Sequence, residues 1–305
     1  MNIAFLYAGQ GSQVVGMGKD FYESNETFRK NFDLLPDSLK TLAFEGEMTE
    51  LSKTSNTQPI MVAYAIALTE VLKEQGIKPK MVAGLSLGEY SALYTSEVFT
   101  AKDAIEIVRF RGEQMEKAAE GLNTKMAAVL NLSRELLEEA VKEASQISTV
   151  EIANYNCPGQ IVIAGTLEAV DRACELAMEK GAKRCVALKV SGPFHTSFMK
   201  PCGDALRDEF KKYSFSDMKI PVVFNAIGKE KSEENSIPEL LEKQVQSSVY
   251  FEDSIRYMIQ NGIDTFVEIG PGKVLSGFIK KIDKTVNVIA IDSVETLDKA
   301  LEMLH

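Results

Sequence analysis

A serine stands at the centre of GLSLG, residues 84–88, between an apolar run and a stretch typical of a helix. A G-x-S-x-G pentapeptide at such a junction is typical of a nucleophile elbow, because the glycines permit a sharp turn that leaves the serine hydroxyl exposed. Ser86 is therefore a candidate nucleophile for acyl transfer. The pentapeptide alone also fits an ordinary strand-to-helix turn with Ser86 near the helix start.

A serine hydroxyl needs a base to become nucleophilic, and histidine is the commonest base near neutral pH. The chain has 2 histidines, of which His305 is the last residue and His195 lies in SGPFHT, residues 191–196. A lone histidine is often a surface residue or a satisfied core residue. The position of His195 between a strand end and a helix start favours a functional role, and we expect it to titrate at about pH 6 to 7.

The oxyanion of an acyl-transfer reaction needs N–H donors, which often lie near a helix N-terminus. Leu87, the residue after the serine, supplies one candidate N–H group. The segment GQGSQ, residues 9–13, could supply a second through Gln10, because its glycines let the backbone approach closely. The same segment also fits a plain glycine turn.

Two arginines lie among apolar residues in IVRFRG, residues 107–112. Arg109 has glutamates three residues before and four residues after it, so its charge can be met on its own helix. Arg111 has no acidic residue at these spacings. A buried Arg111 would need a partner elsewhere, which could be a substrate carboxylate held by two hydrogen bonds. A structural ion pair or a solvent-exposed position is the alternative.

The elements around these residues predict an α/β protein. Apolar runs at residues 2–7 and 81–83 are typical of strands, and helices are expected over residues 59–75 and about 100–120. Residues 125–190 follow the order strand, helix, strand, strand, helix, strand, which is the ferredoxin-like unit. Its expected elements are strands at 126–130, 150–155, 161–164 and 184–190 and helices at 134–144 and 167–180.

A helix from about residue 197, strands at 221–224 and 265–269, and further helices complete the chain. This order predicts a large α/β domain, residues 1–123 and 191–305, interrupted by a small ferredoxin-like domain, residues 124–190.

Composition excludes several classes of function. The chain has 305 residues, 45% of them hydrophobic, and no apolar run long enough to span a membrane. A net charge of −10 disfavours nucleic acid as a partner. The N-terminus lacks the cationic segment of a secretion signal, so we expect a cytoplasmic protein by default. We also expect a monomer. Four cysteines without C-x-x-C spacing are expected to be reduced and non-catalytic: Cys157, Cys174, Cys185 and Cys202.

Five motifs together resemble the malonyl-CoA:acyl-carrier-protein transacylases over essentially the whole chain. They are GQGSQ at 9–13, GLSLGEY at 84–90, RGEQM at 111–115, GPFH at 192–195 and EIGPG at 268–272. The resemblance implies a hydrolase-like α/β core with a parallel sheet and a small inserted ferredoxin-like domain, in agreement with the pattern above. It also implies ping-pong transfer of malonyl from coenzyme A to the phosphopantetheine thiol of an acyl carrier protein. The thioesters of coenzyme A and of phosphopantetheine are then substrates, and no metal or bound cofactor is expected.

The resemblance assigns a role to each candidate residue. Ser86 would carry the acyl group, and His195 would be general base and then general acid. Gln10 and Leu87 would supply the oxyanion N–H groups, and Arg111 would bind the malonyl carboxylate. Three further positions match the family near the site: Gln244, whose neighbourhood orients the histidine, and Asn154 and Gly270, expected behind the reacting groups.

One position departs from the family, which usually has histidine where this chain has Leu85. Phe194, beside the base, resembles malonyl-selective relatives, in which its bulk would crowd an α-methyl group. Lys280, Lys281 and Lys284, beyond the EIGPG turn, are candidates for docking an acidic carrier protein, or they form a solvated helix face. Two other functions stay open: an esterase, which would have no use for Arg111, and an inactive scaffold that binds carrier protein.

Overall fold

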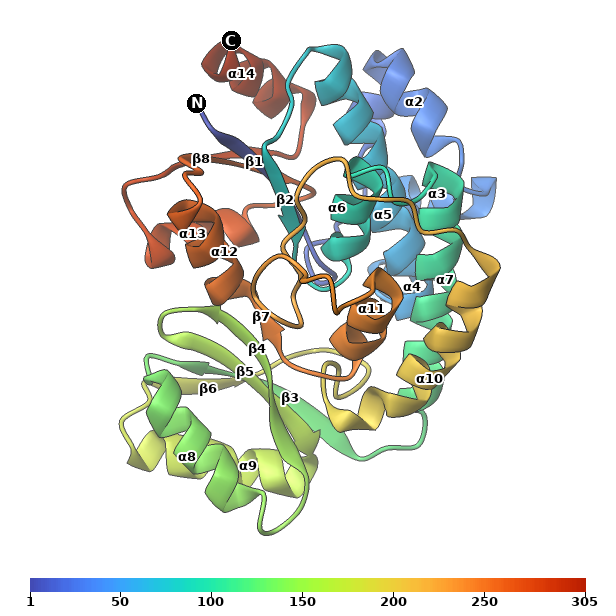
Figure 1. The fold of residues 1–305 in the computed structure, drawn as a ribbon. Helices are drawn as coiled ribbons and strands as arrows, with labels where there is room; N and C mark the ends of the chain where they lie inside the picture. The colour runs from blue at the N-terminus through green and yellow to red at the C-terminus, as the bar shows by residue number, and fades with distance from the viewer.

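The chain forms two β-sheets that lie in different parts of the molecule (Figure 1). A computed structural model describes residues 1–305. The first sheet has four strands in the order β2-β1-β8-β9, all parallel. Its strands are β1 (Ile3–Tyr7), β2 (Met81–Gly84), β8 (Thr265–Ile269) and β9 (Asn287–Ile291). Parallel neighbours place the carboxyl ends of β1, β2 and β8 at one edge, so the loops that follow them lie together.

Helices surround this sheet, and α5 (Thr54–Glu74), largely buried, is central among them. The others before residue 120 are α1 (Lys19–Ser24), α2 (Glu26–Phe32), α3 (Asp37–Glu45), α4 (Met48–Leu51), α6 (Gly88–Thr95) and α7 (Ala101–Ala119). Those after residue 190 are η1 (Ser197–Met199), α10 (Lys200–Glu209), η2 (Phe210–Lys212), α11 (Ile237–Val245), α12 (Phe251–Gln260), α13 (Val274–Ile282) and α14 (Val294–Leu304). This sheet and these helices are called the large unit below.

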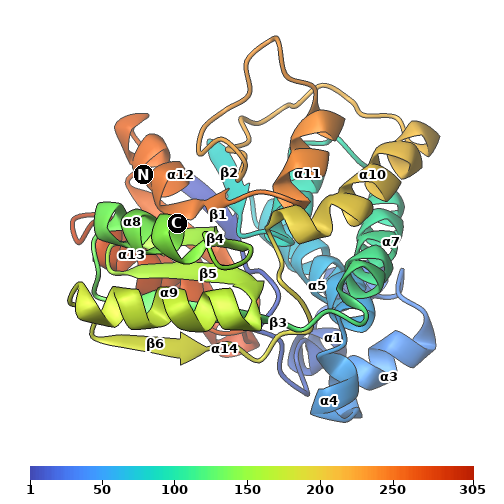
Figure 2. The same cartoon turned by 90° about the horizontal axis from the view of Figure 1, so that it is seen from below.

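The second sheet has the order β6-β3-β5-β4-β7. Its first four strands are antiparallel and, with two helices, form a ferredoxin-like unit, called the small unit below. The small unit comprises β3 (Thr124–Leu130), α8 (Arg134–Ala144), β4 (Val150–Cys157), β5 (Gln160–Thr166), α9 (Leu167–Glu179) and β6 (Arg184–Ala187). Figure 2 shows α8 and α9 side by side along this sheet. The predicted α/β class with its ferredoxin-like insertion is confirmed.

Alternation along the strands gives the small sheet two apolar faces. Ala127 and Val129 pack into a core shared with α8 and α9, whereas Met126 and Ala128 belong to the main core of the large unit. The small sheet therefore lies between its own helices and the large unit. One strand crosses the boundary: β7 (Val249–Tyr250) comes from the large unit and pairs in parallel with β4. The domain limits inferred from the sequence stay a prediction.

Three expected elements differ in the structure. The helix expected from residue 59 begins at Thr54, so Pro59 lies inside it, where its ring leaves the carbonyl of the preceding turn without an N–H donor. Residues 221–224 form only isolated bridges, one of them between Val82 and Val222. The Val82 N–H donates to the Pro221 backbone oxygen at 2.9 Å, and the Val223 N–H donates to the Val82 backbone oxygen at 3.0 Å. Strand β6 ends at Ala187, three residues earlier than expected. None of the helices combines the length and the hydrophobicity that a membrane span requires.

Candidate active site

Ser86 lies in the turn between β2 and α6 and has φ 52°, in the left-handed region. Its flanking glycines are required by close packing. A Cβ at Gly84 would lie 2.0 Å from the Gly88 carbonyl carbon, and a Cβ at Gly88 would lie 2.1 Å from the backbone oxygen of Tyr7. The turn is therefore pressed against the end of β1 and has the backbone strain of a nucleophile elbow.

Asn225 holds this turn in place. Its side-chain oxygen accepts a hydrogen bond from the Ser86 N–H at 2.6 Å, and its side-chain nitrogen donates to the Gly84 oxygen at 2.7 Å. The Asn225 N–H itself donates to the Glu89 carboxyl at 2.6 Å. Asn225 was not among the site residues predicted from the sequence. The available signal was its position directly after the apolar residues 221–224, next to the carboxyl end of β2.

His195 is placed as the base for Ser86. Its Nε2 lies 2.7 Å from the serine Oγ, and its Nδ1 lies 2.8 Å from the backbone oxygen of Gln244. A carbonyl oxygen can only accept, so Nδ1 carries the proton and the lone pair of Nε2 faces the serine hydroxyl. This arrangement assigns to Gln244 the carbonyl that orients the histidine, in place of an acidic third residue.

The pKa of His195 differs from the value expected from the sequence. Burial first, and then the positive charge of Arg111, lower this pKa to about 4. The prediction of titration at pH 6 to 7 assumed an ordinary environment and is wrong for the free enzyme. At neutral pH the imidazole is therefore uncharged and can accept the serine proton.

Gln10 and Leu87 present free backbone N–H groups beside Ser86. Both residues line the same cavity as Ser86, and neither N–H donates a hydrogen bond within the protein. Leu87 directly precedes α6, where the helix dipole favours negative charge. The Gln10 side chain is held by a bond to Thr54 Oγ1 at 3.0 Å. These two groups have the character of oxyanion donors.

Arg111, on α7, is completely buried and makes no ion pair within 4.0 Å. Its Nη2 donates to Ser86 Oγ at 3.2 Å and to Gln244 Oε1 at 3.1 Å. The other three guanidinium N–H groups, one on Nε and two on Nη1, have no partner. The guanidinium carbon Cζ lies over the Tyr90 ring, 5.5 Å from its centroid. A buried charge with unused donors beside the serine suits an anionic substrate group.

The nearby carboxyl of Glu89 does not compensate Arg111 fully. Glu89 is also completely buried, and burial raises its pKa to about 8, against the lowering effects of the Asn225 N–H and of Arg111. Most of this carboxyl is therefore protonated at pH 7.

Gln244 connects the three candidate residues. Besides accepting from His195 through its backbone oxygen and from Arg111 through Oε1, it donates from Nε2 to the Ser86 carbonyl at 2.8 Å. It lies in the last turn of α11, whose start is fixed by a capping box between Ser236 and Glu239. Only its position near the histidine was predicted from the sequence; its contacts with Arg111 and Ser86 were not.

A cavity of about 720 Å³ lies above these groups, within the range typical of small-molecule sites. Its walls come from both units: Ser86, Arg111 and His195 from the large unit, and Asn154 and Val162, among others, from the small unit. Leu85 and Phe194 also line this cavity. Gly270 does not line it and lies instead against Ala8, just before the Gln10 loop.

Comparisons with known proteins cover both units. The family described as "Acyl transferase domain" matches residues 4–299. The malonyl CoA-acyl carrier protein transacylase of Bacillus subtilis (strain 168) is 44% identical over 307 residues, which cover 99% of this chain and 97% of that protein.

Solved structures give the same result. The structure of MCAT from Streptococcus pneumoniae matches with a TM-score of 0.94 at 46% identity, and 99% of each chain is covered. A malonyl-transacylase solved in complex with a type II PKS acyl-carrier protein matches with a TM-score of 0.96 at 35% identity, over 99% of this chain and 100% of that chain. The similarity therefore extends over the whole cavity and both of its walls.

Proposed function

The chain belongs to the acyl transferase domain family, and we propose that it transfers malonyl from malonyl-CoA to the phosphopantetheine thiol of an acyl carrier protein. This reaction supplies fatty acid biosynthesis. The observation that carries the proposal is the buried Arg111 guanidinium, which has three unused N–H groups and lies 3.2 Å from Ser86 Oγ. A malonyl group has a free carboxylate at the end opposite its thioester, so it can meet Arg111 while its carbonyl reaches Ser86.

The first half-reaction acylates the enzyme. Ser86 Oγ attacks the thioester carbonyl while His195 Nε2 takes the serine proton. The N–H groups of Gln10 and Leu87 stabilise the oxyanion. When the carbon–sulfur bond breaks, His195 gives its proton to the departing sulfur, which leaves coenzyme A as the free thiol and malonyl as an ester of Ser86.

The second half-reaction reverses these steps with another thiol. His195 takes the proton of the phosphopantetheine thiol, whose sulfur attacks the Ser86 ester. When the ester bond breaks, His195 returns the proton to Ser86 Oγ. The reaction as proposed uses side chains and backbone N–H groups throughout, so it calls for no metal or cofactor.

Binding of malonyl also changes the electrostatics of the base. The charge of Arg111 is one cause of the low pKa of His195, and a bound carboxylate would offset that charge. We therefore expect the pKa of His195 to rise when malonyl binds, so that this pKa lies closer to the pH at which the enzyme works. An uncharged acyl group would leave the imidazole a weaker base.

Two alternatives are less well supported. An esterase would also use Ser86 and His195, but it would bury the charge of Arg111 without need. An inactive scaffold would not need the hydrogen bond of 2.7 Å between Ser86 Oγ and His195 Nε2. The relatives named above are transacylases, in agreement with the transfer reaction.

The acceptor is proposed to be an acidic carrier protein, and the similar transacylase solved with an acyl-carrier protein supports this class of partner. Lys280, Lys281 and Lys284 are exposed at and beyond the end of α13 and make no ion pair within 4.0 Å, so they are candidates for docking it. We further propose that the enzyme works as a monomer, because one chain supplies every group of the site. Four free cysteines fit the reducing cytoplasm as the place of reaction.

The experiment is a rapid-mixing assay with labelled malonyl-CoA. We expect a burst of acyl-enzyme that persists until a carrier protein is added and then moves to that protein. Rapid release of free malonate would favour an esterase, and absence of labelled enzyme would favour a scaffold. Either result would overturn the proposed function.

A further inference from the structure

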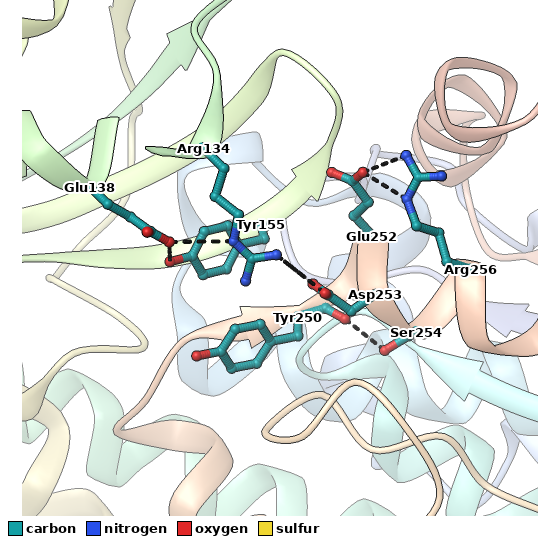
Figure 3. A network of polar contacts seen from close by, with 8 residues as sticks. All are labelled: Arg134, Glu138, Tyr155, Tyr250, Glu252, Asp253, Ser254 and Arg256. Atoms are coloured by element: carbon teal, nitrogen blue, oxygen red, sulfur yellow. Dashed lines mark hydrogen bonds and ion pairs between the residues drawn. The ribbon is translucent and has the colours of Figure 1, made fainter. Parts of the chain in front are cut away.

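A group of five side chains joins the small unit to the large unit outside the cavity (Figure 3). It is called the Arg134 clasp below and consists of Arg134, Glu138, Tyr155, Tyr250 and Asp253. Arg134 is the first residue of α8, and its Nη1 lies 3.2 Å from both carboxylate oxygens of Asp253, in the first turn of α12. Its Nε donates to Glu138 at 3.3 Å.

Two stacked tyrosines complete the clasp. The Arg134 guanidinium lies 3.7 Å from the Tyr155 ring centroid, within the range of a cation–π contact. The Tyr155 ring stacks on the Tyr250 ring with centroids 5.2 Å apart and planes 12° apart, and the Tyr155 hydroxyl donates to Glu138 at 2.9 Å. Three residues of the clasp come from the small unit and two from the large unit, so it spans the boundary.

The clasp lies where the second sheet has its shortest strand pairing. Strands β4 and β7 pair only at Asn154 with Val249 and at Tyr155 with Tyr250. Asn154 lines the cavity, and its neighbour Tyr155 belongs to the clasp. The clasp is therefore one of the contacts that hold β4 beside this cavity wall.

The large-unit side of the clasp is connected to the nucleophile turn. The Tyr250 N–H donates to the backbone oxygen of Asn225 at 2.9 Å, and the side-chain oxygen of Asn225 accepts a hydrogen bond from the Ser86 N–H. Elsewhere on β4, Glu151 accepts hydrogen bonds from the N–H and hydroxyl of Ser197, and the Ile152 backbone oxygen accepts one from Ser248 Oγ at 2.5 Å. These contacts and the packing of Met126 and Ala128 in the main core remain when the clasp is lost, so the small unit would shift relative to the large unit and stay attached to it.

We infer that Arg134 is a positioning residue that sets the distance between the Ser86 and Asn154 walls of the cavity. The inference rests on the proposed function, because malonyl-CoA is the substrate taken to contact both walls. Release of the clasp should weaken binding of that substrate. It should spare the reactivity of Ser86 itself, because the contacts of Ser86 with His195 and Asn225 lie within the large unit.

The test compares Arg134→Ala, Arg134→Lys and the control Arg172→Ala. Arg172 is similarly exposed and ion-paired, but all its partners lie in the small unit: Glu143, Glu175 and Glu179. For Arg134→Ala we expect the KM for malonyl-CoA to rise about three- to thirty-fold. A change of this size corresponds to the free energy of one cation–π contact together with one exposed ion pair. Arg134→Lys should be intermediate, because an ammonium keeps the charge opposite Asp253 but cannot stack on Tyr155. The KM of Arg172→Ala for malonyl-CoA should equal that of the wild type.

A second readout separates positioning from a general loss of structure. The rate at which a small alkyl fluorophosphonate labels Ser86 should be the same in all four proteins. The inference is overturned if the KM of Arg134→Ala equals that of Arg172→Ala, or if labelling of Ser86 falls in parallel with malonyl transfer. If Arg134→Ala does not fold, Arg134→Lys decides by the same two measurements.

Failure of the proposed function would be distinguishable from failure of the inference about the clasp. If the wild-type enzyme transferred no malonyl, amide hydrogen exchange would decide on the clasp alone. Residues 249–256 should then exchange faster in Arg134→Ala than in Arg172→Ala, and equal exchange would overturn the inference.

Discussion

Arg111→Ala should separate malonyl transfer from acetyl transfer. Acetyl- and malonyl-CoA differ at the acyl end by the carboxylate that Arg111 is proposed to bind. The guanidinium is completely buried, and its three unused N–H groups have no acceptor in the protein. Removal of one partner of a buried, hydrogen-bonded charge pair costs about 2 to 5 kcal/mol, so kcat/KM for malonyl-CoA should fall roughly 30-fold to several thousand-fold. Acetyl transfer should fall much less, or rise, because it has no charge to pair.

The assay is kcat/KM for both thioesters in each protein, compared as a ratio. Arg111→Lys should recover little, because an ammonium lacks the planar fork that pairs with both carboxylate oxygens. Arg109→Ala is the matched control on the same helix, since Arg109 is exposed and paired with Glu113 at 3.2 Å. Equal losses on the two thioesters would refute the assignment, because Arg111 would then support the fold or the shared thioester chemistry.

Three further predictions concern the base and the docking of the carrier protein. His195 must be uncharged to act, and its pKa in the free enzyme is about 4. We therefore expect kcat/KM to rise with pH through about 4 and to stay level from about pH 5 to 7. In His195→Ala, kcat/KM should fall roughly 10²- to 10⁴-fold. A pH–rate profile that instead turns near 6.5 would contradict this pKa. Lys280→Glu with Lys281→Glu should raise the KM for carrier protein and spare that for malonyl-CoA. Unchanged kinetics with carrier protein would remove both lysines from the docking surface.

Local patterns were enough to predict the succession of strands and helices along the small unit and the candidates Ser86, His195 and Arg111. A glycine-flanked serine, a single internal histidine and an arginine without a helical partner are each visible within a few residues. The structure places these three side chains in contact, through bonds of 2.7 and 3.2 Å. Their catalytic roles remain proposals that the experiments above test.

Contacts between distant segments could not be predicted in this way. Asn225 meets Ser86 across 139 residues, and Arg134 meets Asp253 across 119 residues, so no local periodicity links them. The pKa of His195 also depends on folding, because its two main causes are burial and the approach of Arg111. The pairing of β7 with β4 over only two residues is too short to leave an alternating pattern.

The most direct measurement of the central claim is the intact mass of the enzyme after reaction with malonyl-CoA, followed by peptide mapping. The wild type should gain one malonyl group, located at Ser86. Ser86→Ala should gain none and keep its thermal unfolding transition, because the change removes one oxygen from a preformed turn. A malonyl adduct on another residue of a folded Ser86→Ala protein would contradict the account.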